Sequence, residues 1–600
     1  MNMPAKWQAK KPANASVLEQ YTKLGEKHGS LLPQVLWARD LGETSVAIEK
    51  FLSPKLENLQ SPFTITNLER AADRLVSAVL AGEKIAIYGD YDMDGMSGLS
   101  LLVSFFKGIN HHNVTHIQPH RFLDGYGVHP RLIQKLHDEG SSVVITVDTG
   151  SMAFEADDKA AELGMAYIIT DHHQCDPLRM PKTPFFVNPN QAVDTSTLKY
   201  LSGVGVAFYL AMGLRAKLRA QKYFESRGIP EFNLLELLDL FSLGSIGDVV
   251  PLTGDNRVLV KYGLERLRNT QRPGLRVLLD AVLENKPKIG ARDVAFSVVP
   301  KLNSASRMGK AELSTKLLLE SDSDQAAITF DEIMGLNGER TKLQKIAVLE
   351  AKAQAQAGSD RGDRVMVVCG DWHEGILGIV AAKIADEFSR PSIVLAKAHD
   401  SEGQEILRGS MRSPAPHHSL KILGLGKEYL LKFGGHQAAA GLALRPENYD
   451  VFREALQSPI EGASREESNV LSYDGVLEKL PKFHEVKALE NLEPLGAGNP
   501  EPLFLLKAFS IGDFEILKET HIKAKKSGVE FIGFSMFSKL EEISKTDAYV
   551  DLLVVPEIST FRFQEKAQMR IHAIRPSIEK RTHLSAGSSR PEASAEIPAL

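Results

Sequence analysis

The stretch KIAIYGDYDMDG (residues 84–95) indicates the fold of the chain. Its first five residues are a short apolar run, which is typical of a buried parallel strand. Two similar runs follow, VVITV (143–147) and YIIT (167–170), with helix-like segments between the three runs. This alternation of strand and helix predicts a doubly wound α/β domain, which we expect at residues 71–265.

Residues that can bind a metal follow each of these three strands. They are Asp90, Asp92 and Asp94 after the first strand, Asp148 after the second, and Asp171, His172 and His173 after the third. The carboxyl ends of strands face one crevice in open α/β sheets, so these clusters should converge in space. Any one of them alone is more typical of a turn, because Asp and Gly are common turn residues. Three clusters in succession favour a metal site.

A further carboxylate, Asp248, follows the helix-like segment 234–247. Together with Asp92, Asp94 and Asp148 it would crowd negative charge, which raises pKa values unless cations neutralise it. Two divalent ions would balance these carboxylates, and mixed carboxylate and imidazole ligands suit Mn²⁺, with Mg²⁺ as the alternative. Two ions about 4 Å apart can activate water and stabilise an in-line phosphoryl displacement. The pattern therefore predicts phosphodiester hydrolysis.

The rest of the chain predicts further domains. Residues 324–356 are expected to form a long helix of about 50 Å that separates two domains, bent at its glycines or straight. A second α/β region begins near residue 364. Its GGHQAAAG (434–441) is expected to open a helix and present N–H groups to an anion, or else to serve tight backbone packing. Short strands between about 465 and 575 predict a small barrel.

Composition excludes some classes of protein. The 600 residues include two cysteines, Cys175 and Cys369, which cannot build a disulfide framework. No apolar stretch approaches the roughly 20 residues of a membrane span, and the basic N-terminus lacks a signal sequence. The net charge of -5 requires any nucleic-acid site to concentrate its basic residues locally. We expect a cytoplasmic monomer that does not bind a membrane.

As a set, the motifs resemble the DHH phosphoesterase superfamily, and their order and spacing look like its RecJ family. The other matching stretches are RFLDGYG (121–127), LSGVGVAF (201–208), GSIGDVVPL (244–252), PKLNSASRMG (300–309), DWHEGILGIVAAK (371–383), GSMRS (409–413), KFGGHQAAAG (432–441) and LEPLGAGNPEP (492–502). The resemblance covers roughly residues 30–575 and implies a DHH domain at 71–265, a helical connector with the LNSASRM motif at 266–356, a DHH-associated domain at 357–460 and an OB-fold barrel at 461–576. The sequence pattern predicts a helical extension at 1–70, and the Ser-, Ala- and Pro-rich composition predicts a disordered tail at 577–600.

The resemblance also implies roles for individual residues. The metal ligands would be Asp92, Asp94, Asp148, His172 and Asp248; the catalytic residues would be His173, Asp148 and Asp90; and the substrate phosphates would be held by Arg121, Asn303, Arg307, Ser410, Arg412 and His436. Arginine suits this last task because its planar fork donates two parallel hydrogen bonds to phosphate. Departures from the usual family pattern are Lys301, Ser304, Ser306 and Glu374, none of which is an expected ligand.

Two further groups of residues are considered for binding. Candidates for contacts to single strands in the barrel are His521, Lys523, Lys525, Lys526, Phe531, Phe534 and Phe537, although core packing is expected for most of the phenylalanines. A histidine-rich stretch contains His111, His112, His116 and His120, which we interpret as a solvated loop and strand entrance rather than a metal site.

The activity implied by the resemblance is a 5′→3′ exonuclease specific for single-stranded DNA, acting in DNA repair and recombination. A DHH phosphodiesterase for short oligonucleotides or cyclic dinucleotides, a pyrophosphatase and a non-catalytic replication scaffold are the alternatives. No G-x-x-x-x-G-K-[ST] loop for ATP is present, so we expect a helicase and a single-strand-binding protein as partners.

Overall fold

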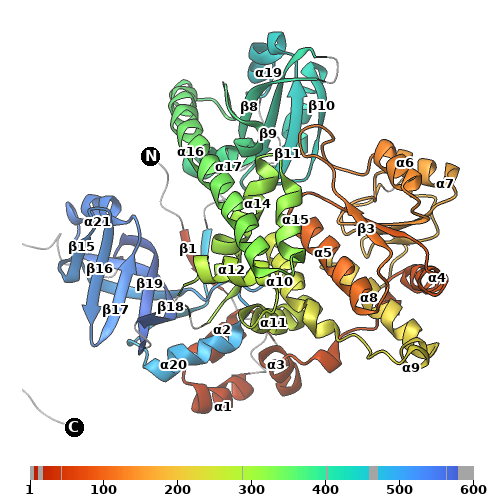
Figure 1. Ribbon diagram of the computed structural model, residues 1–600. Coiled ribbons are helices and arrows are strands. Elements are labelled where there is room, and N and C mark those ends of the chain that lie inside the picture. The colour runs from red at the N-terminus through yellow and green to blue at the C-terminus, as the bar shows by residue number, and fades with distance from the viewer. Residues whose placement is uncertain are drawn as a thin grey trace, which may run out of the picture. The chain divides into compact units, whose positions relative to one another are not determined.

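The chain forms two compact units in the computed structural model (Figure 1). The structure describes residues 6–10, 18–41, 44–176, 178–284, 286, 288–400, 403–458, 470–561 and 564–578; the expected tail lies outside them from residue 579 onward. One unit comprises Lys55–Ser468 with Pro494–Asn499, and the other comprises Met1–Pro54, Asn469–Glu493 and Pro500–Leu600.

The predicted doubly wound domain is present in the first unit. Its parallel sheet has the order β3 (Val114–Ile117), β2 (Ile85–Gly89), β4 (Val143–Val147), β5 (Ala166–Thr170) and β6 (Phe186–Val187). Successive strand residues point to opposite faces. Ile85 and Ile87 therefore join the core beneath α4 (Leu68–Ala81), α5 (Met93–Gly108) and α8 (Gly203–Ala220). Tyr88 packs on the other face, with α6 (Pro130–Asp138) and α7 (Phe154–Glu162).

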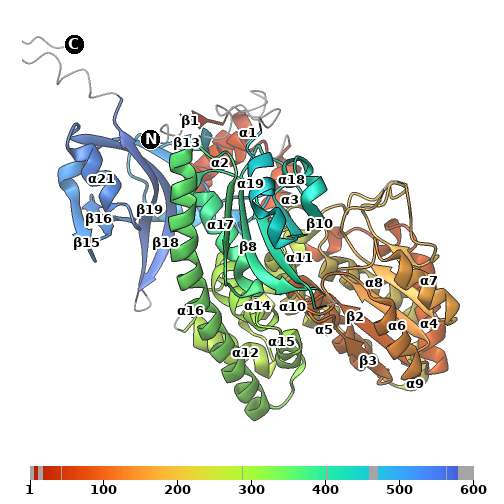
Figure 2. The same ribbon diagram turned by 90° about the horizontal axis from the view of Figure 1, so that it is seen from above.

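A helical region continues the same core. It contains α10 (Leu238–Gly247), α11 (Gly254–Arg268), α12 (Pro273–Val282), α14 (Val299–Arg307) and α15 (Ala311–Leu319). The long helix is α16 (Ser323–Arg361), which passes through Gly335 and Gly338 without interruption and runs from α12 to α17 (Figure 2). Ala326, Phe330 and Ile333 of its first half are buried in this core. The predicted long connecting helix is therefore confirmed.

The second α/β domain covers the other half of α16. Its sheet has the order β10 (Leu430–Gly435), β11 (Ala439–Leu444), β9 (Glu405–Arg412), β8 (Ser392–His399) and β7 (Met366–Gly370). Only the β7–β8 pair is parallel. Ala347, Ala351 and Ala355 of α16 pack under this sheet with α17 (Leu377–Phe388). The opposite face is covered by α18 (Ser419–Gly424) and α19 (Tyr449–Ala455).

One prediction for this domain is wrong. GGHQAAAG does not open a helix, because it forms the turn and inner strand of the β10–β11 hairpin, where Gly434 pairs with Gly441. Its alternation has the period of a strand: Ala440 and Leu442 are buried, whereas Gly441 between them is exposed. The backbone N–H groups of this segment therefore serve a sheet.

The other unit contains the predicted barrel region and the N-terminal segment. Seven strands form one sheet in the order β13 (Gly475–Val476), β14 (Phe504–Ser510), β18 (Tyr549–Phe561), β19 (Gln564–Pro576), β17 (Val529–Gly533), β16 (His521–Lys526) and β15 (Phe514–Leu517). The N-terminal β1 (Lys6–Ala9) pairs with β12 (Val470–Tyr473) and precedes α1 (Leu18–His28), α2 (Leu31–Ala38) and α3 (Ser45–Leu52). The shorter helices are α20 (Phe483–Ala488) and α21 (Phe537–Ser544).

The buried carboxylate of Asp474 ties these parts of the second unit together. It accepts hydrogen bonds from Arg39 at 2.9 Å and from Lys10 at 2.7 Å. The N-terminal segment therefore belongs structurally with the C-terminal strands. Among the described residues, no helix is both long and apolar enough to cross a bilayer.

Candidate active site

The acidic residues of GDYDMDG are placed by the start of α5. Asp92 caps this helix, since its Oδ1 accepts the N–H of Asp94 at 3.0 Å and that of Gly95 at 3.3 Å. Asp94 lies in the first turn and is buried. The N-terminus of α8 points at it: Asp94 accepts hydrogen bonds from the N–H groups of Gly203 and of Val204. Two helix termini thus hold these carboxylates at the end of β2.

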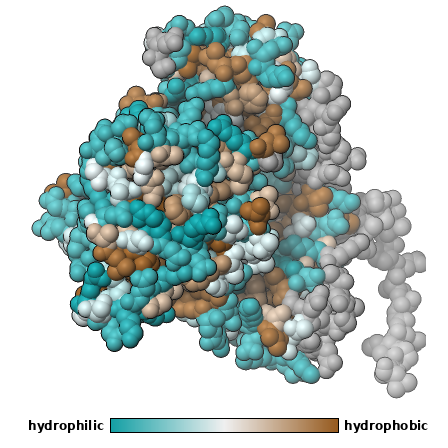
Figure 3. All heavy atoms as spheres, turned by 90° about the vertical axis from the view of Figure 1, so that its right-hand side faces the viewer, coloured by the Kyte–Doolittle hydropathy of each residue, from teal (hydrophilic) through white to brown (hydrophobic). Residues whose placement is uncertain are grey.

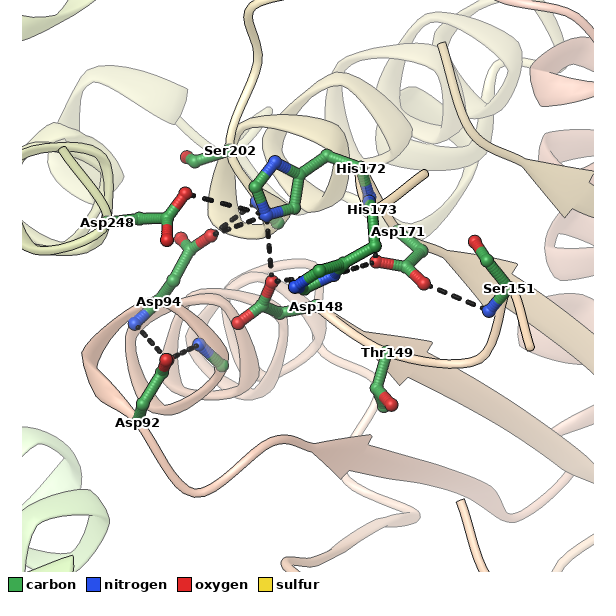
Figure 4. Close-up of polar contacts among 12 residues, drawn as sticks. Asp92, Asp94, Asp148, Thr149, Ser151, Asp171, His172, His173, Ser202 and Asp248 are labelled. Atoms are coloured by element: carbon green, nitrogen blue, oxygen red, sulfur yellow. Dashed lines mark hydrogen bonds and ion pairs between the residues drawn. The ribbon is translucent and has the colours of Figure 1, made fainter. Parts of the chain in front are cut away.

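The clusters that follow β2, β4 and β5 converge, together with Asp248 at the end of α10. His172 Nε2 lies 3.1 Å from Asp148 Oδ1, 3.5 Å from Asp248 Oδ2 and 3.8 Å from Asp94 Oδ2. The three carboxylates gather at the Nε2 side of the His172 ring (Figure 4). Asp148 is 2% exposed and has a φ of 62°, a left-handed conformation that costs about 1–3 kcal/mol for a non-glycine residue. Such strain is typical of functional sites.

The carboxylates repel one another strongly. Burial and the charge of Asp92 raise the pKa of Asp94 to about 7. Burial and the charges of Asp94 and Asp92 raise the pKa of Asp248 to about 8. The pKa values of Asp148 and Asp90 are raised well above the usual range, first by burial and then by neighbouring carboxylates. The protein alone therefore does not compensate the charge that it gathers here.

Three buried ligand atoms at this site make no well-formed hydrogen bond within the described chain: Asp90 Oδ1, and Asp148 Oδ1 and His172 Nε2, which only approach each other as an ion pair. Buried polar atoms without partners are rare, because each costs about 1–3 kcal/mol. Three groupings of donor atoms lie within 4.8 Å of one another: Asp148, His172 and His173; Asp94, His172 and Asp248; and Asp90, Asp92 and Asp148. This mixed set of carboxylate and imidazole atoms fits Mn²⁺ or Mg²⁺.

Asp171 differs from the other acidic residues because its oxygens are already occupied. Its Oδ1 accepts the N–H groups of His172 and His173, and His173 Nδ1 donates to the same oxygen at 2.8 Å. Its Oδ2 accepts the N–H of Ser151. Burial disfavours the charged form of His173, but the charge and hydrogen bond of Asp171 outweigh it and raise the pKa of His173 to about 9. Asp171 therefore orients and charges His173.

Tyr126 is a functional candidate that the sequence does not single out. Its hydroxyl oxygen lies 3.1 Å from His173 Nδ1. Within its motif, RFLDGYG, the residue type that indicates phosphate binding is Arg121. The position of Tyr126 beside His173 depends on the path of the loop after β3, which has no periodic pattern.

A cleft of about 1970 Å³ adjoins this site and is lined by both α/β domains. All six residues expected to hold phosphate line it: Arg121, Asn303, Arg307, Ser410, Arg412 and His436. His436 stacks on His173 with ring centroids 6.1 Å apart. The structure therefore brings phosphate-binding candidates from both α/β domains into one cleft beside the carboxylate cluster.

Three arginines in the cleft are held without carboxylate partners among the described residues. Arg121 lies over the Tyr91 ring at 4.8 Å and donates to Ser306 Oγ, and Arg412 donates to Ser410 Oγ at 2.9 Å. Burial, followed by the charges of Arg121 and Arg412, lowers the pKa of Arg307 to about 9. A half-buried group of cations without carboxylate partners is a typical environment for a bound anion. Ser306, one of the departures from the family pattern, contributes directly to this arrangement.

The loop carrying Arg121 also touches the second α/β domain. Phe122 packs edge-on against His373, with ring centroids 5.4 Å apart. Arg408 forms an ion pair with Glu374 at 2.6 Å and points to the Phe122 carbonyl at 3.5 Å. Glu374, another departure from the family pattern, therefore takes part in the contact between the two domains.

The remaining candidates have varied surroundings. Phe531 is buried against Phe509, as expected for a core residue, while Phe534 is exposed beside His521. Lys526 lies over the Phe509 ring at 4.8 Å, and Lys523 pairs with Glu530. Lys525 is exposed, and Phe537 is half-buried at the start of α21.

The histidine-rich stretch needs one correction. His111 is not solvated, because it is buried against Phe106 with ring centroids 5.8 Å apart. His112 bonds to Asn110, and none of the four histidines belongs to a potential metal cluster among the described residues.

The outer face that carries α6 and α7 is mainly hydrophilic, with hydrophobic residues in small separate groups (Figure 3).

Comparisons with known proteins agree with this architecture. Family models match residues 84–244 (DHH family, N-terminal domain), 362–462 (DHHA1 domain) and 480–573 (RecJ OB domain). The single-stranded-DNA-specific exonuclease RecJ of Escherichia coli is 33% identical, over 76% of this chain and 81% of the relative. The protein of that name from Dickeya dadantii is 32% identical, over 88% and 93%.

Two solved structures are similar over nearly the whole chain. The crystal structure of Thermus thermophilus RecJ with Mn²⁺ has a TM-score of 0.77 at 27% identity, covering 99% of this chain and 81% of that one. The corresponding structure with Mg²⁺ has a TM-score of 0.72 at 26% identity, covering 99% and 80%.

Proposed function

The chain belongs to the RecJ family of single-stranded-DNA-specific exonucleases, and from this premise we propose that it removes nucleotides from the 5′ end by a mechanism that uses two metal ions. It is a metal-dependent exonuclease that uses Mn²⁺ or Mg²⁺ and takes single-stranded DNA as its substrate. One observation carries the mechanism: a cluster of carboxylates and histidine with unpartnered ligand atoms shares a cleft with three arginines that lack carboxylate partners within the described chain.

The proposed metal ligands are Asp92, Asp94, Asp148, His172 and Asp248. Asp148 and His172 each belong to two of the three groupings of donor atoms. Asp148 is the one of the pair with two oxygens, which supports its assignment as the ligand shared by both ions. Bound divalent ions would supply an activated water and neutralise charge on the phosphate. Asp90, which also has an unpartnered oxygen in the cluster, is proposed as an additional acidic residue of the site.

His173 is proposed to act on the scissile phosphate. Asp171 holds the proton on Nδ1, so the second N–H of the charged imidazole, at Nε2, can donate to a phosphate oxygen. In the metal-free protein the charge and hydrogen bond of Asp171 raise the pKa of His173 to about 9, which favours the protonated imidazole. Its position at the cleft, beside His436 of the second α/β domain, supports this role.

The proposed phosphate-binding residues are Arg121, Asn303, Arg307, Ser410, Arg412 and His436. Arg412 and Ser410 lie on β9, and we assign to them the 5′-terminal phosphate of the strand. The exposed Lys525 and Phe534 of the second unit are proposed to contact more distant nucleotides, since cationic and aromatic groups suit single strands without reading their sequence.

The alternative functions are less consistent with these features. A non-catalytic scaffold would be expected to have lost ligands, whereas all six of Asp92, Asp94, Asp148, His172, His173 and Asp248 are present. A phosphodiesterase for short oligonucleotides would have no need for the OB domain. A helicase and a single-strand-binding protein as partners, action in repair and recombination, a cytoplasmic location and a monomeric state stay predictions.

The proposal can be tested with single strands labelled at the 5′ or the 3′ end. With Mn²⁺ or Mg²⁺, we expect a 5′ label to be released at once as a mononucleotide, and a 3′ label to remain on progressively shorter strands. A chelator should stop both reactions. Early release of the 3′ label would contradict the proposed polarity, and activity that survives the chelator would contradict the metal mechanism.

A further inference from the structure

We propose that Asn188 and Asn190, in the segment FVNPNQ (186–191) after β6, are positioning residues that hold the His172-His173 dipeptide in its working geometry. The inference rests on the proposed function, because it takes His172 as a metal ligand and His173 as the group that acts on phosphate. The sequence alone singles out neither asparagine.

The backbone of the dipeptide is held entirely by side chains. Asp171 Oδ1 accepts the N–H groups of His172 and His173, at 2.8 and 3.2 Å. Asn190 Nδ2 donates to the His172 carbonyl at 2.5 Å, and Asn188 Nδ2 donates to the His173 carbonyl at 2.9 Å. All four backbone polar groups of the dipeptide therefore have a partner, and the two carbonyls depend on the asparagines.

The asparagines are themselves held firmly. Asn188 is fully buried, and its Nδ2 also donates to Ser151 Oγ at 2.8 Å. Its Oδ1 accepts the N–H of Asn190 at 2.7 Å, which couples the two residues. Lys199 Nζ donates to the Pro189 carbonyl between them and to Asp194. The turn is thus a rigid support and not a loop that follows the histidines.

This support acts on the position of the imidazole rings. A carbonyl that loses its buried donor will seek another partner, and the peptide planes of His172 and His173 will rotate to find one. His172 Nε2 would then leave the cluster around Asp148, and His173 would lose its alignment with Asp171. Residues that orient a ligand in this way usually change metal affinity about 10-fold to 100-fold when they are mutated.

The test uses the full chain and measures Mn²⁺ affinity by calorimetric titration of the metal-free protein. Asn190→Ala should weaken Mn²⁺ binding about 10-fold or more. Asn190→Asp, which preserves shape but removes the donor, should weaken it at least as much. In electron paramagnetic resonance of the Mn²⁺-loaded protein, the nitrogen coupling from His172 should weaken in both variants. Asn188→Ala should weaken Mn²⁺ binding similarly. If Asn188→Ala fails to fold, the Asn190 variants still test the inference, because Asn190 is only half-buried.

Gln191→Ala provides a matched control. Gln191 is buried and donates to the Phe186 carbonyl of β6, so this variant also loses an amide hydrogen bond in the same turn, but one that does not involve a histidine. It should bind Mn²⁺ normally. Equal weakening in Gln191→Ala and Asn190→Ala would overturn the positioning role, because any damage to the turn would then suffice.

His172→Ala separates this inference from the proposed function. If His172→Ala weakens Mn²⁺ binding and Asn190→Ala does not, the positioning role is wrong while the metal assignment stands. If His172→Ala has no effect, the metal assignment itself fails, and the inference fails with it. Weakening in both, with an unaffected Gln191→Ala, supports both.

Discussion

Gly203 lies directly against Asp148: a Cβ placed on Gly203 would be 2.4 Å from the Asp148 Cβ and 2.7 Å from its Cα. The N–H of Gly203 also donates to Asp94. One glycine at the start of α8 therefore packs on one proposed ligand and binds another.

We expect Gly203→Ala to displace Asp148 and to reduce kcat by at least about 10-fold, with a loss of about 1–3 kcal/mol in the free energy of unfolding. Mn²⁺ titration, steady-state kinetics and urea denaturation would measure these effects. Gly205→Ala is the control, because a Cβ there meets the Leu201 side chain at 3.2 Å and Ser202 Oγ at 3.5 Å but no proposed ligand. Equal activity of the two variants would contradict the close packing of Gly203 against the site.

Asp148→Asn should abolish hydrolysis while stabilising the metal-free protein. Asp148 is buried among other carboxylates, so a neutral amide of the same shape removes repulsion from Asp94 and Asp92. Because Asp148 is the proposed ligand shared by both ions, loss of its carboxylate should reduce activity about 100-fold or more. Nuclease assays at saturating Mn²⁺ and thermal melts in chelator check the two effects. Near-normal hydrolysis by Asp148→Asn would show that Asp148 is not an essential metal ligand.

The stability of the metal-free protein should fall as the pH rises. The folded pKa values of about 7 for Asp94 and about 8 for Asp248 lie above the ordinary value of 3.8, so between about pH 4 and pH 8 these two carboxyl groups bind more protons in the folded protein than in the unfolded chain. Divalent ions replace these protons and restore the stability.

The increase in Tm on adding Mn²⁺ should therefore be larger at pH 8 than at pH 6, when melts are compared with and without chelator. The variant that combines Asp94→Asn with Asp248→Asn should lose part of this pH dependence in the metal-free state, since Asp148 and Asp90 retain raised pKa values. A Tm increase that shrinks toward pH 8 in the unaltered protein would show that the carboxylates are already compensated.

Arg412→Ala should affect strands with a 5′-phosphate more than strands with a 5′-hydroxyl. A hydrogen bond to a charged group contributes about 1.5–3 kcal/mol, so kcat/KM on the phosphorylated strand should fall about 10-fold to 100-fold. The comparison of the two end groups isolates the terminal phosphate. Arg445→Ala, which alters a surface pair with Asp400, should change neither rate. An equal loss on both end groups would place Arg412 elsewhere along the strand.

The parts of the site that could be predicted from sequence are those whose signal is local. Asp92, Asp148 and His172 each follow an apolar strand closely, and the topology of a parallel sheet guarantees that such residues meet. Asp171 also follows an apolar strand, so its place in the sequence does not distinguish its role from that of the proposed metal ligands. Asp171 serves as an acceptor for His173 and not as part of the cluster, which becomes visible only from its hydrogen bonds.

The parts that could not be predicted depend on contacts between distant segments or on very short elements. β6 has two residues, too few for a periodic pattern, and the turn with Asn188 and Asn190 follows it. The sequence predicts a helix start at GGHQAAAG, whereas the structure has a hairpin there. A glycine-rich turn has the same sequence pattern whether a helix or a strand follows it. Arg307 and Arg412 meet only because α16 returns the chain to the cleft, so no local pattern links them.

The continuity of α16 makes the number of its residues as important as their identity. Each residue turns an α-helix by about 100° and advances it by about 1.5 Å. Phe330 and Ile333 face one core and Ala347 and Ala351 face the other, so both sets must keep a constant angular phase. A single insertion between them would turn one set by more than a quarter of a revolution and expose it to water. This stretch of the chain should therefore accept many substitutions across related proteins but very few changes in length.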